Sequence, residues 1–246
     1  MKFYQIINSD LNGLKGQVVS VIGGGGKSTL IETIGKELLD KHLKVILTST
    51  TKFQPMPAIE SVLKTQNKDY LNNLRKILQE KKIALLARDY YKGERLLGVE
   101  KEEIAEILNL ADTVLIEADG CRQRSLKTHK EYEPVIPEIS TTVIIICGAD
   151  VVGKPLNEET VHRADLFSQK WNLPFGTLLT PEVVANELLS QDSYFRHIPK
   201  KVAVSIFINK VDTNPEGGRL LAEEIRRRSH YAIYLGSITE KQLAEI

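Results

Sequence analysis

Four consecutive glycines precede a lysine and two hydroxyl residues in the stretch "VVSVIGGGGKSTLIETIGKEL". Glycines let successive backbone N–H groups converge on an anion without obstruction by Cβ atoms. The helical pattern that follows adds unsatisfied N–H groups and the positive end of a helix dipole. Lys27 is placed to neutralise β- and γ-phosphates, and the Ser28 hydroxyl to bind Mg²⁺. The predicted triphosphate-binding residues are Gly23, Gly24, Gly25, Gly26, Lys27, Ser28 and Thr29.

The spacing of this loop is compact. Val21 occupies the position of the usual first glycine of G-x-x-x-x-G-K-S, which leaves the shorter form G-x-x-G-K-S. Ile22 stands where a deviant form of the loop has a second lysine. The alternative is a glycine turn packed between a strand and a helix, which explains neither the lysine nor the paired hydroxyls.

An acidic cluster ends a second apolar run, "TVLIEADG", at residues 113–120. A carboxylate at this position holds Mg²⁺ beside a triphosphate, and a second one can orient the attacking group. Glu117 stands three residues before Gly120, as in the D-x-x-G pattern of nucleotide switches, and Asp119 is the second candidate. The division of labour between the two acids stays open, and solvated acids at a strand end are the alternative. The predicted catalytic residues are Lys27, Glu117 and Asp119, and the predicted metal ligands are Ser28, Thr50 and Glu117.

A base-reading motif, N-K-x-D, follows the apolar run of residues 202–208. The Asp212 carboxylate can accept two parallel N–H bonds from guanine, whereas adenine offers no such pair on that edge. Asn209 is expected to tie neighbouring loops together, and the stem of Lys210 to pack across the base. The motif therefore favours GTP over ATP, with a generic turn as the alternative.

Further cationic and polar residues lie at or after predicted strand ends. Thr50 or Thr51 in "STTK" is a candidate to complete the magnesium shell. A cationic loop beside a triphosphate can bind a second anion or stabilise charge during transfer, and a histidine can move a proton near neutral pH. Solvated surface charges are the alternative. The candidates for a substrate or second anion are Lys52, Arg122, Lys127, His162 and Arg163.

Apolar runs alternate with helical patterns along the whole chain, which predicts an α/β fold. The runs are short, β-branched and apolar on both faces, as strands between two helical layers must be. We expect a P-loop NTPase-like, mostly parallel sheet with helices on both faces, in three layers and as one domain over 1–246. The expected strands are 17–22, 44–50, 83–88, 113–118, 141–147, 202–208 and 232–236, and the expected helices are 28–42, 69–81, 101–109, 160–171, 181–190 and 216–229. Residues 120–140 are expected to form a long functional loop.

The composition is that of an ordinary globular protein. Hydrophobic residues make up 42% and charged residues 26% of 246 positions, and the formal net charge is +1. This balance gives no overall field for nucleic acid or an acidic membrane surface, and no apolar run approaches the roughly 20 residues of a membrane span. The two cysteines are not a spaced pair and the N-terminus lacks a signal-peptide core, so we expect a cytoplasmic protein.

Several sequence blocks together resemble the YqeC-like family, described as accessory proteins for selenium-dependent molybdenum hydroxylases. The blocks include "GGGGKSTL", "VILTSTTKF", "IEADGCRQRSLKTHKEYEPVIP", "GADVVGKPLNEETVHRADL" and "INKVD". Cys121 departs from the family, which more often has serine there. The resemblance implies a P-loop nucleotide-binding fold and a role in maturing a molybdenum hydroxylase client. Combined with the motifs, it predicts a Mg²⁺-dependent nucleoside triphosphatase that uses GTP or ATP. A transferase or ligase acting on a small acceptor, or a binding module without turnover, remains an alternative.

Overall fold

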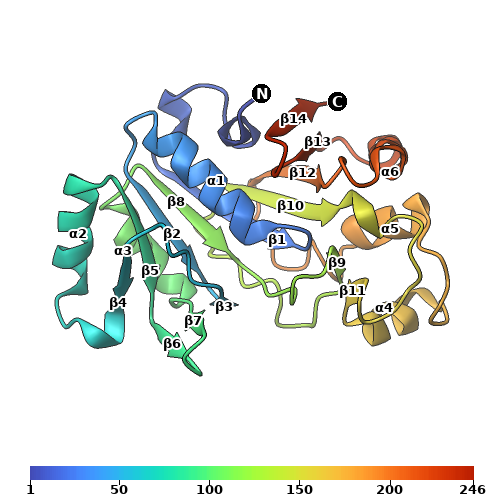
Figure 1. Ribbon diagram of the computed structural model, residues 1–246, viewed down its shortest axis with the longest axis horizontal. Coiled ribbons are helices and arrows are strands. Elements are labelled where there is room, and N and C mark those ends of the chain that lie inside the picture. The colour runs from blue at the N-terminus through green and yellow to red at the C-terminus, as the bar shows by residue number, and fades with distance from the viewer.

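A nine-stranded sheet forms the centre of the molecule (Figure 1). The computed structural model describes all residues 1–246. The strand order is β14-β13-β12-β10-β1-β8-β2-β5-β4, and only the pair β13–β14 is antiparallel. The strands of this sheet are β1 (Gln17–Gly23), β2 (Val45–Ser49), β4 (Ser61–Leu63), β5 (Ile83–Ala87), β8 (Thr113–Glu117), β10 (Thr142–Gly148), β12 (Ala203–Asn209), β13 (Ala232–Ser237) and β14 (Gln242–Glu245).

Helices cover both faces of this sheet, because the strands are apolar on both sides. Along β1, Val19 and Val21 join a core cluster with α1, whereas Val18 and Ile22 join the cluster on the opposite face. Figure 1 shows α1 crossing β1, β8 and β2 on the near face, while the opposite cluster contains residues of the other five α-helices. The α-helices are α1 (Lys27–Leu39), α2 (Tyr70–Glu80), α3 (Ile104–Leu108), α4 (Ala164–Trp171), α5 (Pro181–Leu188) and α6 (Pro215–Arg228). The predicted three-layer α/β arrangement is confirmed.

Local sequence signals account for the long elements. Each of the seven predicted strands and six predicted helical stretches contains an element, with ends displaced by a few residues. Thr180 caps α5 as its type suggests, since its hydroxyl accepts the Val183 N–H at 3.3 Å. None of the helices combines the length and apolar character that crossing a bilayer requires.

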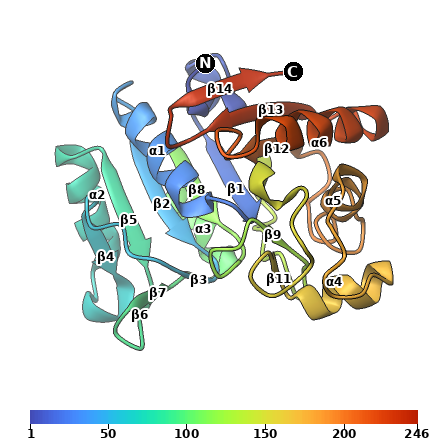
Figure 2. The same cartoon turned by 45° about the vertical axis from the view of Figure 1, so that its right-hand side comes forward.

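Two small sheets and several short 3₁₀ helices were not predicted. The three-stranded sheet consists of β3 (Lys52–Phe53), β7 (Arg95–Leu97) and β6 (Asp89–Tyr91), and the two-stranded sheet of β11 (Val161–His162) and β9 (Leu126–Lys127). The 3₁₀ helices are η1 (Phe3–Ile6), η2 (Asn12–Leu14), η3 (Lys64–Gln66), η4 (Lys101–Glu103) and η5 (Ala149–Val151). The pair β9–β11 gives the long loop of residues 120–140 a fixed place beside the main sheet (Figure 2).

The carboxyl ends of the central strands meet at one edge. β1 lies between β10 and β8, with Gly23 opposite Ile146 and Val21 opposite Glu117. Asn209 at the end of β12 lies opposite Gly148. Open α/β sheets bind ligands at this edge, where the crossovers from a central strand lead to opposite sides. The topology therefore brings the glycine loop, the acidic strand end and the N-K-x-D motif to one place.

Candidate phosphate site

The glycine loop is shaped by close backbone packing as well as by its own turn. Gly25 has φ 89° and Gly26 has φ 127°, values that side chains with a Cβ rarely adopt. A Cβ on Gly25 would lie 2.5 Å from the Gly148 nitrogen, and a Cβ on Gly24 would lie 2.5 Å from the Arg124 oxygen. The glycines thus let the loop lie against two neighbouring segments, a requirement that the sequence pattern did not reveal.

The backbone amides of this loop divide into two groups. The Gly24 N–H donates to the Ile146 carbonyl at 2.9 Å, and the Gly25 N–H donates to the Arg124 carbonyl at 2.8 Å. The Gly23 N–H donates to Asp119 Oδ2 at 2.9 Å. By contrast, the amides of residues 26–29 donate to no protein acceptor. The expected anion nest therefore lies one step further along the chain, at the last glycine and the first turn of α1.

Lys27 is buried against the loop and two carboxylates. Its Nζ donates to the Gly23 carbonyl at 2.6 Å and lies 3.1 Å from Asp119 Oδ1 and 3.9 Å from Glu117 Oε1. Burial alone would lower the pKa of Lys27, but the two carboxylates outweigh it and raise the pKa above its ordinary value. The Lys27 ammonium is therefore fully charged. With its neighbours in residues 25–29 it lines a pocket of about 670 Å³, which we call the phosphate pocket.

Ser28 and Glu117 form the part of this pocket that fits Mg²⁺. The Ser28 hydroxyl donates to Glu117 Oε2 at 2.6 Å, and both residues line the pocket. Burial raises the pKa of Glu117, while Lys27 and the Ser28 hydroxyl oppose that rise. Mg²⁺ is commonly held by one or two protein oxygens together with phosphate oxygens and water. No group of three His, Cys, Asp or Glu side chains converges to hold a metal. The Ser28 and Glu117 oxygens can hold an ion together with oxygens of a bound ligand.

Thr50 occupies a different position from the one expected of a metal ligand. Its hydroxyl donates to the Val135 carbonyl at 2.6 Å. The residue lines a neighbouring pocket rather than the phosphate pocket. Thr50 directly follows β2, as the sequence predicted, but its hydroxyl is taken up by the backbone near Val135.

Asp119 is an internal anchor in this structure. Its carboxylate is fully buried, accepts the Gly23 N–H, and lies 2.6 Å from His129 Nε2. Burial would raise the pKa of Asp119, but Lys127, Lys27 and the His129 hydrogen bond lower it strongly. Asp119 does not line the phosphate pocket, so its expected role as a metal ligand or water orienter is not supported by its placement. His129, which sequence reasoning missed, is its hydrogen-bond partner.

A line of alternating charges continues from Asp119 away from the phosphate pocket. Lys127 Nζ lies 3.5 Å from Asp119 Oδ2 and 3.2 Å from Glu133 Oε2, and it donates to the Gly120 carbonyl at 2.7 Å. Arg163 donates two N–H groups to the Glu133 carboxylate, one of them at 2.9 Å. Burial opposes ionisation of Glu133, but Arg163 and Lys127 lower its pKa to about 2. Lys127 is fully buried and lines neither the pocket at the glycine loop nor the larger pocket beside it, so it is not placed to contact a second anion as expected.

The N-K-x-D residues have three different environments. Asn209 is buried, donates to the Gly25 carbonyl at 2.7 Å and accepts the Ile238 N–H at 3.1 Å, which ties the glycine loop to the end of β13. Lys210 lines the phosphate pocket, but its Nζ donates to Ser125 Oγ at 2.8 Å. Asp212 is exposed and makes no hydrogen bond or ion pair within the protein. Its carboxylate is free of protein partners, but unlike Lys210 it does not line the pocket at the glycine loop.

A second pocket, of about 930 Å³, adjoins the first. Arg95 and Arg122 line both pockets, so they mark the junction. Four of the five predicted second-anion residues line this second pocket: Lys52, Arg122, His162 and Arg163. Burial and, to a smaller extent, the nearby positive charges of Lys127 and Arg163 lower the pKa of His162 to about 4. The imidazole is thus neutral at pH 7 and does not meet the expectation of a group that titrates near neutrality.

Sequence reasoning did not identify Arg95 or Lys130 as lining residues of the second pocket. Arg95 lies on β7, in the small sheet that was not predicted, and no local motif marks it. Lys130 lies within a family block but carries no pattern of its own. Their place in the pocket depends on tertiary structure, because loops from three parts of the chain meet at the sheet edge.

The fold and site together define a P-loop protein of the α/β class, with a strand, a glycine loop and a helix beside a pocket of about 670 Å³. A family profile described as YqeC protein matches residues 19–165, more than half of the chain. The chain belongs to the YqeC family. Uncharacterized protein YqeC of Escherichia coli (strain K12) is 28% identical over 229 residues, which cover 91% of this chain and 88% of that protein.

Two solved structures of FtsY are similar in arrangement. FtsY from Mycoplasma mycoides, in space group H32, has a TM-score of 0.44 and 13% identity, covering 99% of this chain and 70% of that chain. The cell division protein FtsY from Thermotoga maritima has a TM-score of 0.44 and 14% identity, covering 99% of this chain and 71% of that chain.

Proposed function

We propose that this chain binds a purine nucleoside triphosphate with Mg²⁺, prefers GTP over ATP, and turns over the γ-phosphate. One observation carries the proposal. The unpartnered amides of residues 26–29, the charged Lys27 and the Ser28–Glu117 pair surround the same pocket. Backbone donors, a cation and two magnesium-type oxygens are what a triphosphate requires, and a simple glycine turn requires none of them.

The preference for guanine rests on the surroundings of the N-K-x-D motif. Asn209 fixes the glycine loop to the segment at Ile238, so the phosphate loop and the motif keep a set distance. Asp212 is free to accept two N–H groups from guanine. A hydrogen bond to a charged group contributes about 1.5–3 kcal/mol, so loss of Asp212 is expected to lower GTP affinity by about 10- to 100-fold.

The proposed cellular role is that of an accessory factor in the maturation of a selenium-dependent molybdenum hydroxylase. This part rests on membership of the YqeC family, whose members are described in those terms. We propose that residues 1–246 act as one functional domain, because the strands of a single sheet are drawn from residues 17 to 245.

Calorimetry with GTP, ATP and CTP, each with Mg²⁺, tests the nucleotide site. Wild-type protein should bind GTP most tightly, and Asp212→Ala should bind GTP and ATP alike. Asp40→Ala is the matched control, because Asp40 is also exposed and follows the far end of α1. Equal binding of all three nucleotides by wild-type protein contradicts the base-reading proposal, and no binding at all contradicts the phosphate site.

The contribution of Mg²⁺ is tested with Ser28→Ala. This variant removes one of the two oxygens that fit the ion, so the gain in affinity on adding Mg²⁺ should fall by about tenfold. Thr33→Ala is the control, because Thr33 is a hydroxyl residue one turn further along α1 that does not line this pocket. An unchanged magnesium effect in Ser28→Ala means that the ion is held elsewhere.

A second candidate function is a phosphoryl transferase acting on a small acceptor. The observation that favours it is the second pocket, which adjoins the phosphate pocket through Arg95 and Arg122. A transferase shows little hydrolysis of nucleotide until its acceptor is added, whereas a maturation NTPase is expected to hydrolyse slowly alone and faster with its client.

A further inference from the structure

The second pocket contains cations that the protein itself does not neutralise. Arg122 and Lys130 are exposed, and their side chains make no ion pair or hydrogen bond. The Lys52 ammonium makes no ion pair and lies over the Tyr91 ring, 3.7 Å from its centroid. In contrast, Arg88 and Arg163 of the same pocket are paired with Glu100 and Glu133. The unpaired positive charge of this pocket therefore lies on Lys52, Arg122 and Lys130.

At the junction of the two pockets, one buried N–H donor has no hydrogen-bond acceptor. Arg95 donates one N–H to the Lys52 carbonyl at 2.6 Å, but its Nε is buried and has no acceptor. A buried donor without a partner is unfavourable, which favours an acceptor supplied by a ligand at this guanidinium. Arg122 has φ 47°, a left-handed conformation that is unusual for arginine and holds this residue on the border of both pockets. Two guanidinium groups at one border favour a phosphate or carboxylate group.

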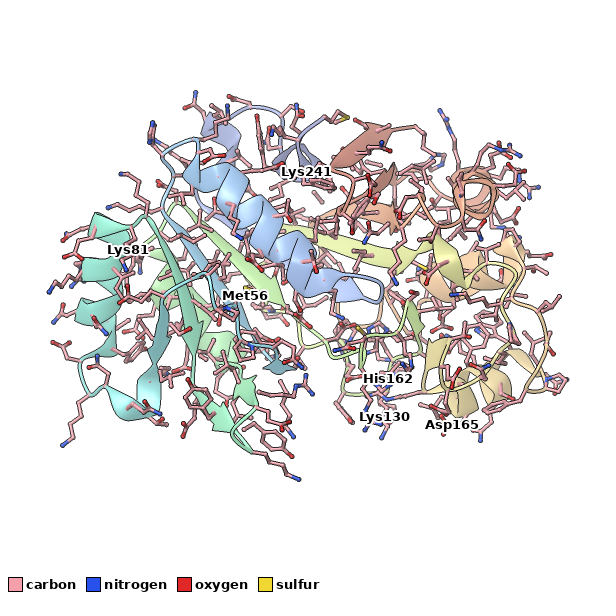
Figure 3. The ribbon with its side chains drawn as sticks, in the orientation of Figure 1. Met56, Lys81, Lys130, His162, Asp165 and Lys241 are labelled. Carbon is pink, nitrogen blue, oxygen red and sulfur yellow. The ribbon has the colours of Figure 1, made fainter.

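Hydrogen-bond acceptors also line the second pocket. Glu158 and Asp165 line this pocket only, are exposed, and form no ion pair. His162, neutral at pH 7, lines the same pocket, and Figure 3 shows Lys130, His162 and Asp165 gathered in one region beside α4. These groups can accept hydrogen bonds from the N–H or O–H groups of a ligand, which would orient a molecule whose anionic end lies at the junction.

The phosphate pocket offers little help to an acceptor that must lose a proton. Glu117 is its only carboxylate, and Glu117 accepts the Ser28 hydroxyl. Asp119 is enclosed by Gly23, Lys27 and His129. A nucleophilic oxygen that is already ionised, as in a carboxylate or phosphate, needs no general base.

From these observations we propose that the second pocket binds a small molecule with an anionic phosphate or carboxylate group and hydrogen-bond donors at its other end. The anionic oxygen is presented to the γ-phosphate and attacks it. A bond forms between that oxygen and the γ-phosphorus, and the bond from the γ-phosphorus to the β–γ bridging oxygen breaks. The nucleoside diphosphate leaves with the electron pair, and no proton is transferred. This inference rests on the nucleotide site proposed above.

Inorganic phosphate is the simplest probe of the anionic subsite. The protein is first saturated with the β,γ-imido analogue of GTP and Mg²⁺, and binding of radiolabelled phosphate is then measured by equilibrium dialysis. One phosphate per chain should bind. Arg122→Gln should weaken phosphate binding by about tenfold, and Lys130→Gln by about threefold because its charge is exposed to solvent. Lys81→Gln, on the opposite side of the molecule in Figure 3, is the control for loss of one positive charge.

The same experiment separates this inference from the nucleotide proposal. If the analogue does not bind, the proposed function fails. If the analogue binds but phosphate does not, or if Arg122→Gln and Lys130→Gln bind phosphate as well as Lys81→Gln does, only the second site is overturned. Acceptor chemistry is tested by incubating γ-labelled GTP with phosphate, which should yield labelled pyrophosphate and GDP. Release of labelled phosphate alone would overturn the acceptor role.

Discussion

The buried His129 predicts a pH dependence of stability that can be worked out from the structure. Burial lowers the pKa of His129 to about 4, although its hydrogen bond to Asp119 opposes that effect. In the unfolded chain a histidine titrates near pH 6.5. The unfolded state therefore binds a proton between pH 6.5 and 4 that the folded state does not bind, so stability falls as the pH falls through that range.

The size of this effect follows from the two pKa values. At pH 5 the unfolded His129 is almost fully protonated, while the folded residue is almost fully neutral. Linkage then gives a loss of about 2 kcal/mol between pH 7 and pH 5 from this residue alone. Other groups also contribute to the total change, so the quantity to measure is the difference between wild-type protein and a variant without the imidazole.

Urea unfolding at pH 7 and pH 5 measures that difference. His129→Gln keeps an N–H donor for Asp119 and does not titrate, so the variant should lose about 2 kcal/mol less than wild-type protein on acidification. It should be less stable than wild-type protein at pH 7, because the fit to Tyr194, 4.5 Å away between ring centroids, is lost. His42→Gln is the control, since His42 is exposed. Equal loss of stability in wild-type protein and His129→Gln would refute the assignment of His129 as neutral.

Three further predictions concern the backbone and the core. Gly25→Ala should lower the free energy of unfolding by more than about 2 kcal/mol and abolish nucleotide binding, measured by urea unfolding and calorimetry, because the new Cβ would meet the Gly148 nitrogen. Ile34→Ala, on the buried face of α1, should cost about 2–5 kcal/mol in urea unfolding. Thr180→Ala should cost about 1 kcal/mol in the same assay through loss of the α5 cap, and no change would mean that the 3.3 Å contact contributes nothing.

The sequence was most informative where one local signal sufficed. Buried strands such as "TTVIIIC" were predicted, because a short apolar run rich in β-branched residues is typical of a strand covered on both faces. β4 and β14 gave no such signal, since they are three and four residues long and partly exposed. Their pairing depends on neighbours that the sheet supplies only after it has formed.

The candidate site shows the same limit at the level of single residues. Lys27, Ser28 and Glu117 were predicted from a motif and a strand end, and the structure places them around one pocket. The residues Lys127 and His129 lie in a polar stretch that looked like a surface loop, yet both are buried. Nothing local distinguishes a solvated lysine from one enclosed by two carboxylates. That distinction depends on β9 and β11, a pairing between segments 35 residues apart.

The buried line of alternating charges restricts how this protein can change over time. Removing Lys127 alone would leave Asp119 with Lys27 and Glu133 with Arg163, but each buried carboxylate would lose one of its two cations, which lowers stability. Replacing Lys127 and Glu133 together would remove one ion pair but leave the Arg163 guanidinium without its carboxylate. Positions 127, 133 and 163 are therefore expected to covary among related proteins.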